Sequence, residues 1–284
     1  MAQLLKGIEV VRAMSERLVA ETDKLKEKGV VPCLCVIRAG NREDDIAYEN
    51  GIVKRCASFG VEVRRVALDE QAETAEVVAE IEKANADSGI HGVLIMRPMP
   101  KQIDDAAVCA ALDPRKDMDG ITDVSMAKLY AGRDDAFAPC TAEACIELLD
   151  HYGIEISGKN IVVIGRSLVI GKPVTLMLIK RNATVTVCHT RTADVRGECR
   201  RADIVIAAAG VAGMVDGEYI AEGQTVIDVG INVDTDGNLC GDVEFDSAEP
   251  KAGAITPVPG GVGTVTSAIL AKHVIMAAQK QSES

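Results

Sequence analysis

Residues 161–173, IVVIGRSLVIGKP, have a pattern that can bind a phosphate group. The first four are apolar and predict a short buried strand that stops at Gly165. Ser167 and Gly171 follow, and the apolar residues beyond them have helical spacing. A strand that breaks into a glycine-containing turn before a helix directs free backbone N–H groups at one point, where a phosphate binds. The spacing is GxSxxxG rather than GxGxxG, so an ordinary strand–helix turn explains this run equally well.

The segments that follow favour a nucleotide site. Three more short strands are predicted at residues 183–187, 204–208 and 225–229, and Gly210 and Gly230 lie at the ends of the last two. Strands that end in glycine and alternate with helical stretches indicate a parallel sheet, whose ligand-binding loops lie at the carboxyl ends of the strands. The second half of the chain is therefore predicted to be a dinucleotide-binding unit.

The end of the second strand of such a unit distinguishes NAD from NADP. An acidic residue there binds the ribose of NAD, whereas a basic one accommodates the additional phosphate of NADP. Residues 188–192, CHTRT, contain Thr190 and Arg191 and no acid, and Arg166 in the first loop adds a second positive charge. NADP is the expected cofactor, with NAD as the alternative.

The composition narrows the classes of function. The 284 residues carry a net charge of −12, which argues against a nucleic-acid surface, and aromatic residues make up only 2%. No apolar run is long enough to span a membrane, and the N-terminus lacks a secretory signal, so no membrane partner is expected. The nine cysteines form no CxxC pair, so we expect no metal site. Free thiols indicate a reducing compartment, and the expected location is the cytoplasm.

The first half also alternates helices and strands. Helices are predicted at residues 4–26, 45–59 and 75–86, and strands at 31–37, 61–68 and 92–96, without a phosphate loop. The expected fold is α/β with two domains, an N-terminal α/β catalytic domain and a Rossmann-type doubly wound parallel sheet. The boundary falls near residues 139–141, before a helix at 142–152. A terminal helix at 265–278 is expected to pack back on the first domain.

Three further features suggest a ligand cleft between the domains. They are the charged turn KDMDG at 116–120, the proline- and glycine-rich run PVPGGVG at 257–263, and Tyr48 on a predicted helix after a polar loop. The prolines and glycines set an irregular backbone that a flat ligand can approach closely. Each feature alone is explained by a solvated turn, a stiff loop or a partly buried tyrosine. Together they favour a substrate site.

The pieces occur together, and in this order, in one known family. The chain resembles the FolD family, the methylenetetrahydrofolate dehydrogenase/methenyltetrahydrofolate cyclohydrolases, over nearly its whole length. The matching blocks are the helix 48–56, GVLIMRPMP at 92–100, KDMDG at 116–120, PCT at 139–141, GRSLVIGKP at 165–173, CHTRT at 188–192, VIDVGIN at 226–232, GDV at 241–243 and ITPVPGGVG at 255–263. The resemblance implies a homodimer that binds NAD(P) and tetrahydrofolate one-carbon derivatives. Residues 1–141 and 265–284 would form the folate-binding catalytic domain and residues 142–264 the NAD(P)-binding domain.

The resemblance also assigns the site residues. Tyr48 and Asp119 are implied to be catalytic and to bind the folate, with Asp119 accepting hydrogen bonds from the pterin ring. The remaining folate contacts are implied to be Pro259, Gly260, Gly261 and Val262. The implied cofactor contacts are Gly165, Arg166, Ser167, Gly171, Thr190, Arg191 and Ile231.

Two departures from the family pattern bear on the reaction. Bifunctional members carry a lysine four residues after the tyrosine, on the same helical face, and a glutamine two residues before the first proline of the PxP block. In this chain the two positions are Ile52 and Met96. Hydride transfer to a nicotinamide requires positioning above all, whereas cyclohydrolysis requires general acid–base catalysis, which neither hydrophobic side chain supplies.

The sequence therefore predicts an NADP-dependent methylenetetrahydrofolate dehydrogenase with weak or absent cyclohydrolase activity. One alternative is a fully bifunctional enzyme that makes 10-formyltetrahydrofolate, with Arg97 or Lys54 replacing the lysine. A second is a non-catalytic dimer that binds folate or dinucleotide. A third is another two-domain Rossmann dehydrogenase, such as one that acts on shikimate.

Overall fold

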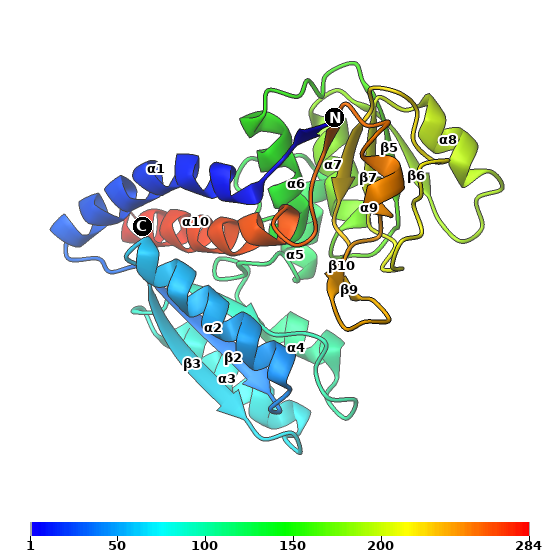
Figure 1. Ribbon diagram of the computed structural model, residues 1–284. Helices are drawn as coiled ribbons and strands as arrows, with labels where there is room; N and C mark the ends of the chain where they lie inside the picture. Colours follow the sequence, from blue (N-terminus) through cyan, green and yellow to red (C-terminus); the bar gives the residue numbers. More distant parts are fainter. Residues whose placement is uncertain (1, 284) are drawn as a thin grey trace. The chain divides into compact units, whose positions relative to one another are not determined.

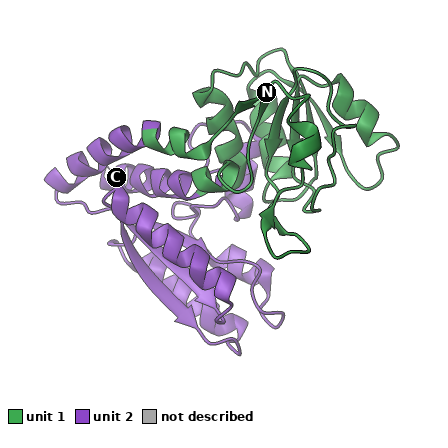
Figure 2. Cartoon of the chain, viewed as in Figure 1, with its two compact units in different colours: residues 1–12, 141–266 green, residues 13–140, 267–284 purple. Residues whose placement is uncertain are grey.

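In the computed structural model, which describes residues 2–283, the chain forms two units (Figure 2). Of the described residues, unit 1 holds 2–12 and 141–266, and unit 2 holds 13–140 and 267–283. Three helices contain residues of both units: α1 (Gly7–Glu27), α6 (Cys140–His151), of which only Cys140 belongs to unit 2, and α10 (Val262–Ser282).

Unit 1 is built on a six-stranded parallel sheet (Figure 1). Its strands lie in the order β1-β11-β8-β7-β5-β6. Their bounds are β1 Gln3–Leu4, β11 Ala254–Ile255, β8 Thr225–Asp228, β7 Ile204–Ala207, β5 Asn160–Ile164 and β6 Thr184–Cys188. The helices are α6 (Cys140–His151), α7 (Gly171–Lys180), α8 (Val195–Arg201) and α9 (Phe245–Ala248). Apolar side chains of β5, β7 and β8 pack against α8 and α9 in one buried cluster. The strand-to-helix turns therefore open at the carboxyl edge of this sheet.

The first residues of the chain belong to the sheet of unit 1. β1 pairs in parallel with β11, with Gln3 opposite Ala254 and Leu4 opposite Ile255. The domain predicted at residues 1–141 therefore differs from unit 2 at its N-terminal end. A two-residue strand has no periodicity of its own, so only its long-range partner reveals it. A second small element, the antiparallel hairpin of β9 (Asn232–Val233) and β10 (Leu239–Cys240), follows the main sheet strand β8.

Unit 2 contains a three-stranded parallel sheet in the order β3-β2-β4. The strands are β2 Cys33–Ala39, β3 Glu62–Leu68 and β4 Gly92–Ile95. The helices are α2 (Glu43–Ser58), α3 (Thr74–Ala86), α4 (Asp105–Ala111) and α5 (Asp123–Tyr130), besides most of α1 and α10. Every residue of the central strand β2 is buried, whereas the edge strand β3 has only exposed and partly buried residues. Its Val66 and Leu68, which point to the same face, pack against the buried core of this unit.

The terminal helix α10 joins unit 2 through its later turns. The side chain of Gln281 donates from Nε2 to the carbonyl oxygen of His91 at 2.9 Å, and His273 contacts the carbonyl of Met118. The predicted fold class, two α/β domains with the last helix packed on the first of them, is confirmed.

All nine cysteines are free thiols, and seven of them are buried. Within residues 2–283, none of the helices combines the length and apolar character that crossing a bilayer requires. The same part of the chain contains no cluster of three histidine, cysteine or acidic side chains arranged to hold a metal ion.

Candidate functional site

The turn after β5 has the shape of a phosphate-binding loop. Gly165 has a φ of +118°, and a Cβ atom at this position would lie 2.1 Å from the carbonyl oxygen of Ala208, so only glycine fits. A Cβ on Gly171 would lie 2.3 Å from the carbonyl oxygen of Gly165, so this glycine lets the first turn of α7 approach the loop. The hydroxyl oxygen of Ser167 accepts the N–H groups of Ile170 and Gly171 at 3.1 and 3.5 Å.

Arg166 and Ser167 are exposed at the tip of this loop, immediately before the ten-residue helix α7. Because the N-terminus of a helix carries a partial positive charge and unpaired N–H groups, an anion is favoured there. The loop geometry fits a dinucleotide phosphate.

The turn after the neighbouring strand β6 presents the second set of cofactor residues. His189 and Thr192 close this turn, since the N–H of Thr192 donates to the carbonyl of His189 at 2.8 Å and the N–H of His189 donates to the hydroxyl of Thr192 at 3.0 Å. Thr190 and Arg191 are left exposed at its tip. β5 and β6 are paired in parallel, so Arg166 and Arg191 follow adjacent strands at the same edge of the sheet. The combined positive charge suits a 2′-phosphate.

Ile231 lies on the loop after β8 at the same edge and is 69% exposed. The residues on either side of it are held by hydrogen bonds to buried carboxylates. The N–H of Gly230 donates to Asp228, and the side chain of Asn232 donates to Asp242. Both carboxylates are buried, and their positions were not anticipated from the sequence.

The PVPGGVG segment leads into α10. Pro259 and Gly260 are exposed, whereas Gly261 and Val262 are buried. The carbonyl of Gly260 accepts the N–H of Gly7 at 2.8 Å, which fixes the segment to the start of α1. Of the four residues implied to contact folate here, only Pro259 and Gly260 therefore offer surface.

Unit 2 brings Tyr48 and Asp119 into one electrostatic environment. Tyr48, on α2, is 46% exposed, and its pKa is raised first by partial desolvation and then by the ionisable groups of Cys140 and Asp119. Asp119 is half-buried, and burial raises its pKa although the N–H of Cys140 donates to its Oδ1 at 2.8 Å. A ligand that donates to this carboxylate would favour its charged form.

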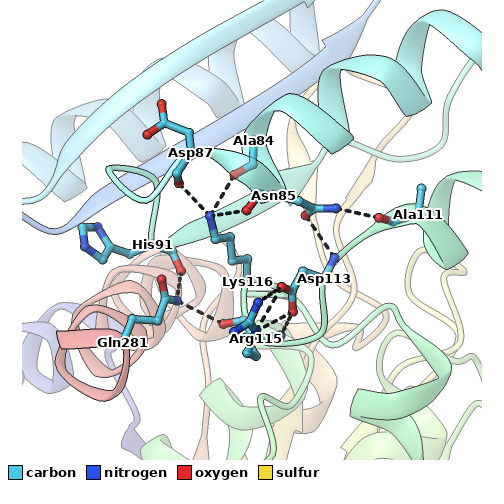
Figure 3. Close-up of polar contacts among 9 residues, drawn as sticks. All are labelled: Ala84, Asn85, Asp87, His91, Ala111, Asp113, Arg115, Lys116 and Gln281. Carbon is cyan, nitrogen blue, oxygen red and sulfur yellow. Dashed lines mark hydrogen bonds and ion pairs between the residues drawn. The ribbon is translucent and has the colours of Figure 1, made fainter. Parts of the chain in front are cut away.

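The segment that carries Asp119 is anchored by Lys116 (Figure 3). The ammonium group of Lys116 donates to the carbonyl oxygens of Ala84, Asn85 and Asp87 at 2.9, 2.9 and 2.7 Å, at the C-terminal end of α3. Carbonyls at the end of a helix have no partners within it, so a buried cation there is well placed.

Asp117 and Met118 hold the other side of the same segment. Asp117 is fully buried, and its carboxylate accepts the N–H groups of Ile121 and Thr122 at 3.0 and 2.8 Å. The Nδ1 atom of His273 lies 2.8 Å from the carbonyl oxygen of Met118, and because a carbonyl only accepts, this nitrogen carries the proton. The backbone on both sides of Asp119 is thus fixed.

Comparisons with known proteins agree with these features. Residues 5–119 match the family description "Tetrahydrofolate dehydrogenase/cyclohydrolase, catalytic domain", and residues 139–282 match its "NAD(P)-binding domain". The chain belongs to the tetrahydrofolate dehydrogenase/cyclohydrolase family. This membership decides against the shikimate-dehydrogenase alternative.

Relatives of this family match along their full lengths. "Bifunctional protein FolD" of Alkaliphilus oremlandii is 46% identical over 281 residues, 99% of both chains. A bifunctional FolD structure from Campylobacter jejuni is 35% identical with a TM-score of 0.96, covering 99% of both chains. The Trypanosoma brucei FolD structure, complexed with NADP cofactor and an inhibitor, is 36% identical with a TM-score of 0.94, and the match covers 100% of this chain and 99% of that one.

This family member has hydrophobic side chains at the two departures noted above. Ile52 is fully buried on α2, one turn after Tyr48, and Met96, directly after β4, is 8% exposed. Neither side chain can give or accept a proton at neutral pH.

The two nearby basic residues are poorly suited to replace the lysine. Arg97 forms a bidentate ion pair with Asp105 of α4, with Nε 2.7 Å from Oδ1. Burial is the largest single effect on the pKa of Arg97 and lowers it, but the hydrogen bonds with Asp105 and the nearby negative charges together raise it overall, so the side chain stays protonated. Lys54 is exposed, whereas Ile52 on the same helix is fully buried.

A buried ion pair beside Tyr48 is a further feature that sequence reasoning missed. Glu49 is 2% exposed, and its Oε2 lies 3.1 Å from Nε of Arg38, the sixth residue of β2. The guanidinium of Arg38 also donates to the carbonyl of Gly40 and, at 2.9 Å, to Asn41. An arginine within the otherwise apolar run CLCVIRA was the available signal, because a buried charge needs a partner.

Proposed function

We propose that this protein oxidises 5,10-methylenetetrahydrofolate to 5,10-methenyltetrahydrofolate with NADP by direct hydride transfer, and that its cyclohydrolase activity is weak or absent. The observation that carries the proposal is the pair of hydrophobic residues Ile52 and Met96, beside phosphate-loop and carboxylate features that are intact.

When bound, NADP supplies the hydride acceptor for this chemistry. The loops of unit 1 would hold the dinucleotide through Gly165, Ser167, Arg166 and Arg191. In unit 2, the Asp119 carboxylate would accept hydrogen bonds from the amino and ring N–H groups of the pterin, a two-donor edge that matches its two oxygens. The Tyr48 ring would border the folate. These roles are binding and orientation, which suffice for transfer of a hydride between two positioned carbons.

Cyclohydrolysis requires acid–base catalysis in addition to binding and orientation. Water must add to the methenyl carbon, and protons must move as the ring opens, so a positioned acid or base contributes typically about 10²–10⁴-fold. Ile52 and Met96 supply neither. The methenyl compound would therefore leave as the product.

The decisive experiment follows the reaction product. The purified protein is mixed with methylenetetrahydrofolate and NADP, and the near-ultraviolet absorbance of methenyltetrahydrofolate is recorded after the NADPH signal has reached its plateau. We expect the methenyl absorbance to persist and to decay only at the rate seen in buffer. Hydrolysis of added methenyltetrahydrofolate well above that rate would establish the bifunctional alternative, which the names of the relatives also fit.

A pair of variants tests the cause. Ile52→Lys combined with Met96→Gln places the family's polar side chains back at both positions, and we expect it to gain measurable hydrolysis. The matched control, Ile52→Leu with Met96→Leu, disturbs the same sites without adding a proton donor or acceptor and should remain inactive in hydrolysis. Equal hydrolysis by both variants would show that the activity does not depend on polar side chains at positions 52 and 96.

The non-catalytic alternative predicts a different result of this assay for the unmodified protein. A folate- or dinucleotide-binding dimer without activity would bind NADPH and reduce no NADP in the same assay. Both the dehydrogenase and the non-catalytic dimer are expected to have intact cofactor loops, so a turnover assay distinguishes the two alternatives and a binding assay does not.

The expected partners are tetrahydrofolate one-carbon derivatives and a second copy of the chain. We propose a homodimer, as the resemblance implies, and light scattering of the purified protein tests it. The net charge of −12 supports the expectation that neither nucleic acid nor an anionic membrane surface is a partner. The nine free thiols support a reducing compartment such as the cytoplasm.

A further inference from the structure

A single buried carboxylate in unit 1 gathers four hydrogen-bond donors. Oδ2 of Asp242 accepts the backbone N–H groups of Ala209 and Gly210 at 2.6 and 2.9 Å. Oδ1 accepts the N–H of Val211 and the side-chain amide of Asn232, both at 2.9 Å. Asp242 is fully buried, so these groups take the place of water around its charge.

A second buried carboxylate supports the first. Oδ1 of Asp228, at the end of β8, accepts the N–H groups of Gly230 and Asp242 at 3.0 and 2.9 Å, and Oδ2 accepts that of Val243 at 3.0 Å. A Cβ atom on Gly241 would lie 1.8 Å from Oδ2 of Asp228, and one on Gly230 would lie 2.3 Å from Oδ1 of Asp242. The two glycines thus let the chain close around both carboxylates.

The arrangement ties together loops that are far apart in the sequence. Residues 209–211 follow β7, residues 230–232 follow β8, and residues 242–243 follow β10. The donors of the first two loops meet on one side chain from the third. A buried charge is stable only while its donors are in place, so each loop is held in a single conformation. The exposed Ile231 lies between two residues that are held in place, because Gly230 donates a hydrogen bond to Asp228 and Asn232 donates one to Asp242.

We propose that Asp242 is a positioning residue for the dinucleotide: by holding loops 209–211 and 230–232 at the carboxyl edge of the sheet, it preforms the surface on which NADP binds. The inference rests on the proposed function for the placement of NADP at this edge. It adds a residue that touches no ligand and acts through the loops. A preformed surface spares the cofactor the cost of ordering the loops on binding.

The test is Asp242→Asn, which keeps the shape of the side chain. An amide has one accepting oxygen, and its NH2 group would face N–H donors, so at least one loop must release. Direct titration with NADPH should show the dissociation constant raised about tenfold or more, as expected from the loss of hydrogen bonds to a charged group. The Michaelis constant for NADP should rise in parallel. The Michaelis constant for methylenetetrahydrofolate should stay within about threefold of the unmodified protein, because none of the four groups that donate to Asp242 belongs to the implied folate contacts.

Asp203→Asn is the matched control. Asp203 also accepts a backbone N–H group, that of Asn160 at 2.8 Å, but it lies before β7 at the amino edge of the same sheet. This variant should bind NADPH as the unmodified protein does.

Asn232→Ala is the second test variant. It removes one of the four donors to Asp242 and leaves the charge in place, so it should fold and raise the dissociation constant for NADPH by a smaller factor. This variant decides the question if Asp242→Asn does not fold.

The outcomes are separable. Failure of the unmodified protein to bind NADPH would overturn the cofactor assignment in the proposed function. Normal NADPH binding by the unmodified protein together with unchanged binding by folded Asp242→Asn would overturn the positioning role, even if the melting temperature of the variant fell. If Asp242→Asn does not fold, unchanged binding by Asn232→Ala overturns it instead. A raised dissociation constant in either test variant, with Asp203→Asn unaffected, supports it.

Discussion

At the scale of single residues, Asp119 combines a binding task with a structural one. Its Oδ1 accepts the N–H of Cys140 at the start of α6, and its flanking residues are anchored by Lys116 and Asp117. Besides its expected role in folate binding, Asp119 therefore has a structural partner in the N–H of Cys140. Removing the carboxylate leaves that N–H without its partner, which costs about 1–3 kcal/mol in a partly buried site.

Asp119→Ala should therefore abolish dehydrogenase turnover and lower the melting temperature only modestly. Burial raises the pKa of Asp119, so in the free enzyme the charged form that accepts from the pterin is lost at a higher pH than for an ordinary aspartate. The acid limb of kcat/KM for folate should accordingly lie above the usual aspartate range. Steady-state assays and thermal melts of the variant check the first expectation, and a pH profile of the unmodified protein checks the second. Normal folate turnover by Asp119→Ala would refute its placement in the site.

Arg166 is the residue on which cofactor preference is expected to depend most. It is exposed on the loop after β5, next to a turn that carries Arg191 and no acid. Arg166→Ala should raise the Michaelis constant for NADP and leave NAD use nearly unchanged, because only NADP has the 2′-phosphate that a guanidinium binds. Parallel initial rates with both cofactors measure this. Equal or better catalytic efficiency with NAD in the unmodified protein would contradict the preference.

At the scale of elements, the sequence predicts the long and strongly patterned segments best. Buried strands such as β5 (Asn160–Ile164) and the helix α3 (Thr74–Ala86) lie within one residue of their predicted bounds. Two-residue strands such as β1 and β9 were missed, as were the short helices α5 and α9. Segments this short have no hydrophobic period to read, and their conformation depends on partners elsewhere in the chain.

The same reason explains which site residues the sequence revealed. The loop at Gly165 was recognisable because strand, glycine and helix follow one another directly. Asp242 was not, because its backbone donors are 31 to 33 residues away in the sequence. The anchoring of Lys116 depends likewise on carbonyls about 30 residues away. Such contacts between a side chain and a distant backbone leave no local spacing pattern.

Asp228, at the end of β8, is expected to make the stability of the folded protein depend on pH. Burial raises its pKa from 3.8 to about 6, and the hydrogen bonds from Val243, Asp242 and Gly230 only partly oppose this, while the nearby Asp242 charge adds to it. The folded protein therefore binds this proton more tightly than the unfolded chain does. The contribution of Asp228 to stability is thus greatest below pH 4 and is lost as pH rises toward 6, by about 3 kcal/mol at most.

Thermal melts of the unmodified protein and of Asp228→Asn between pH 4.5 and pH 7 check this expectation. Groups that do not interact with Asp228 titrate equally in both proteins, so the difference in melting temperature reports on Asp228 together with its coupling to Asp242. The unmodified protein should lose stability relative to the variant as pH rises. A difference that stays constant, or that shifts in the opposite direction, would show that hydrogen bonding to the carboxylate outweighs its burial.

At the scale of the whole molecule, the nine cysteines are spread over both units and serve as internal probes of folding. Seven are buried, and only Cys109 and Cys240 are partly exposed. Burial raises the pKa of Cys56 in unit 2 and of Cys199 in unit 1 to about 12 each. The thiolate is the reactive form, so these thiols are protected both by access and by protonation.

A thiol reagent at neutral pH should therefore label Cys240 and Cys109 in the native protein, with the other seven cysteines labelled only as the chain opens. Peptide mapping by mass spectrometry assigns each label. Saturating NADP should slow the labelling of Cys188 and Cys199, because a ligand that binds only the folded state stabilises it by RT ln(1 + [L]/Kd), about 100-fold in the opening equilibrium at 100 times Kd. Both cysteines belong to unit 1, on β6 and α8, within its buried core cluster.

NAD at the same concentration is the matched control and should protect these two cysteines less, because it lacks the phosphate that Arg166 and Arg191 are expected to bind. Labelling of Cys188 or Cys199 as fast as Cys240 without ligand would show that the core of unit 1 opens readily. Labelling that NADP leaves unchanged would show instead that the dinucleotide does not bind the folded unit. The measurement thus tests cofactor binding without relying on turnover, and it does so in the unmodified protein.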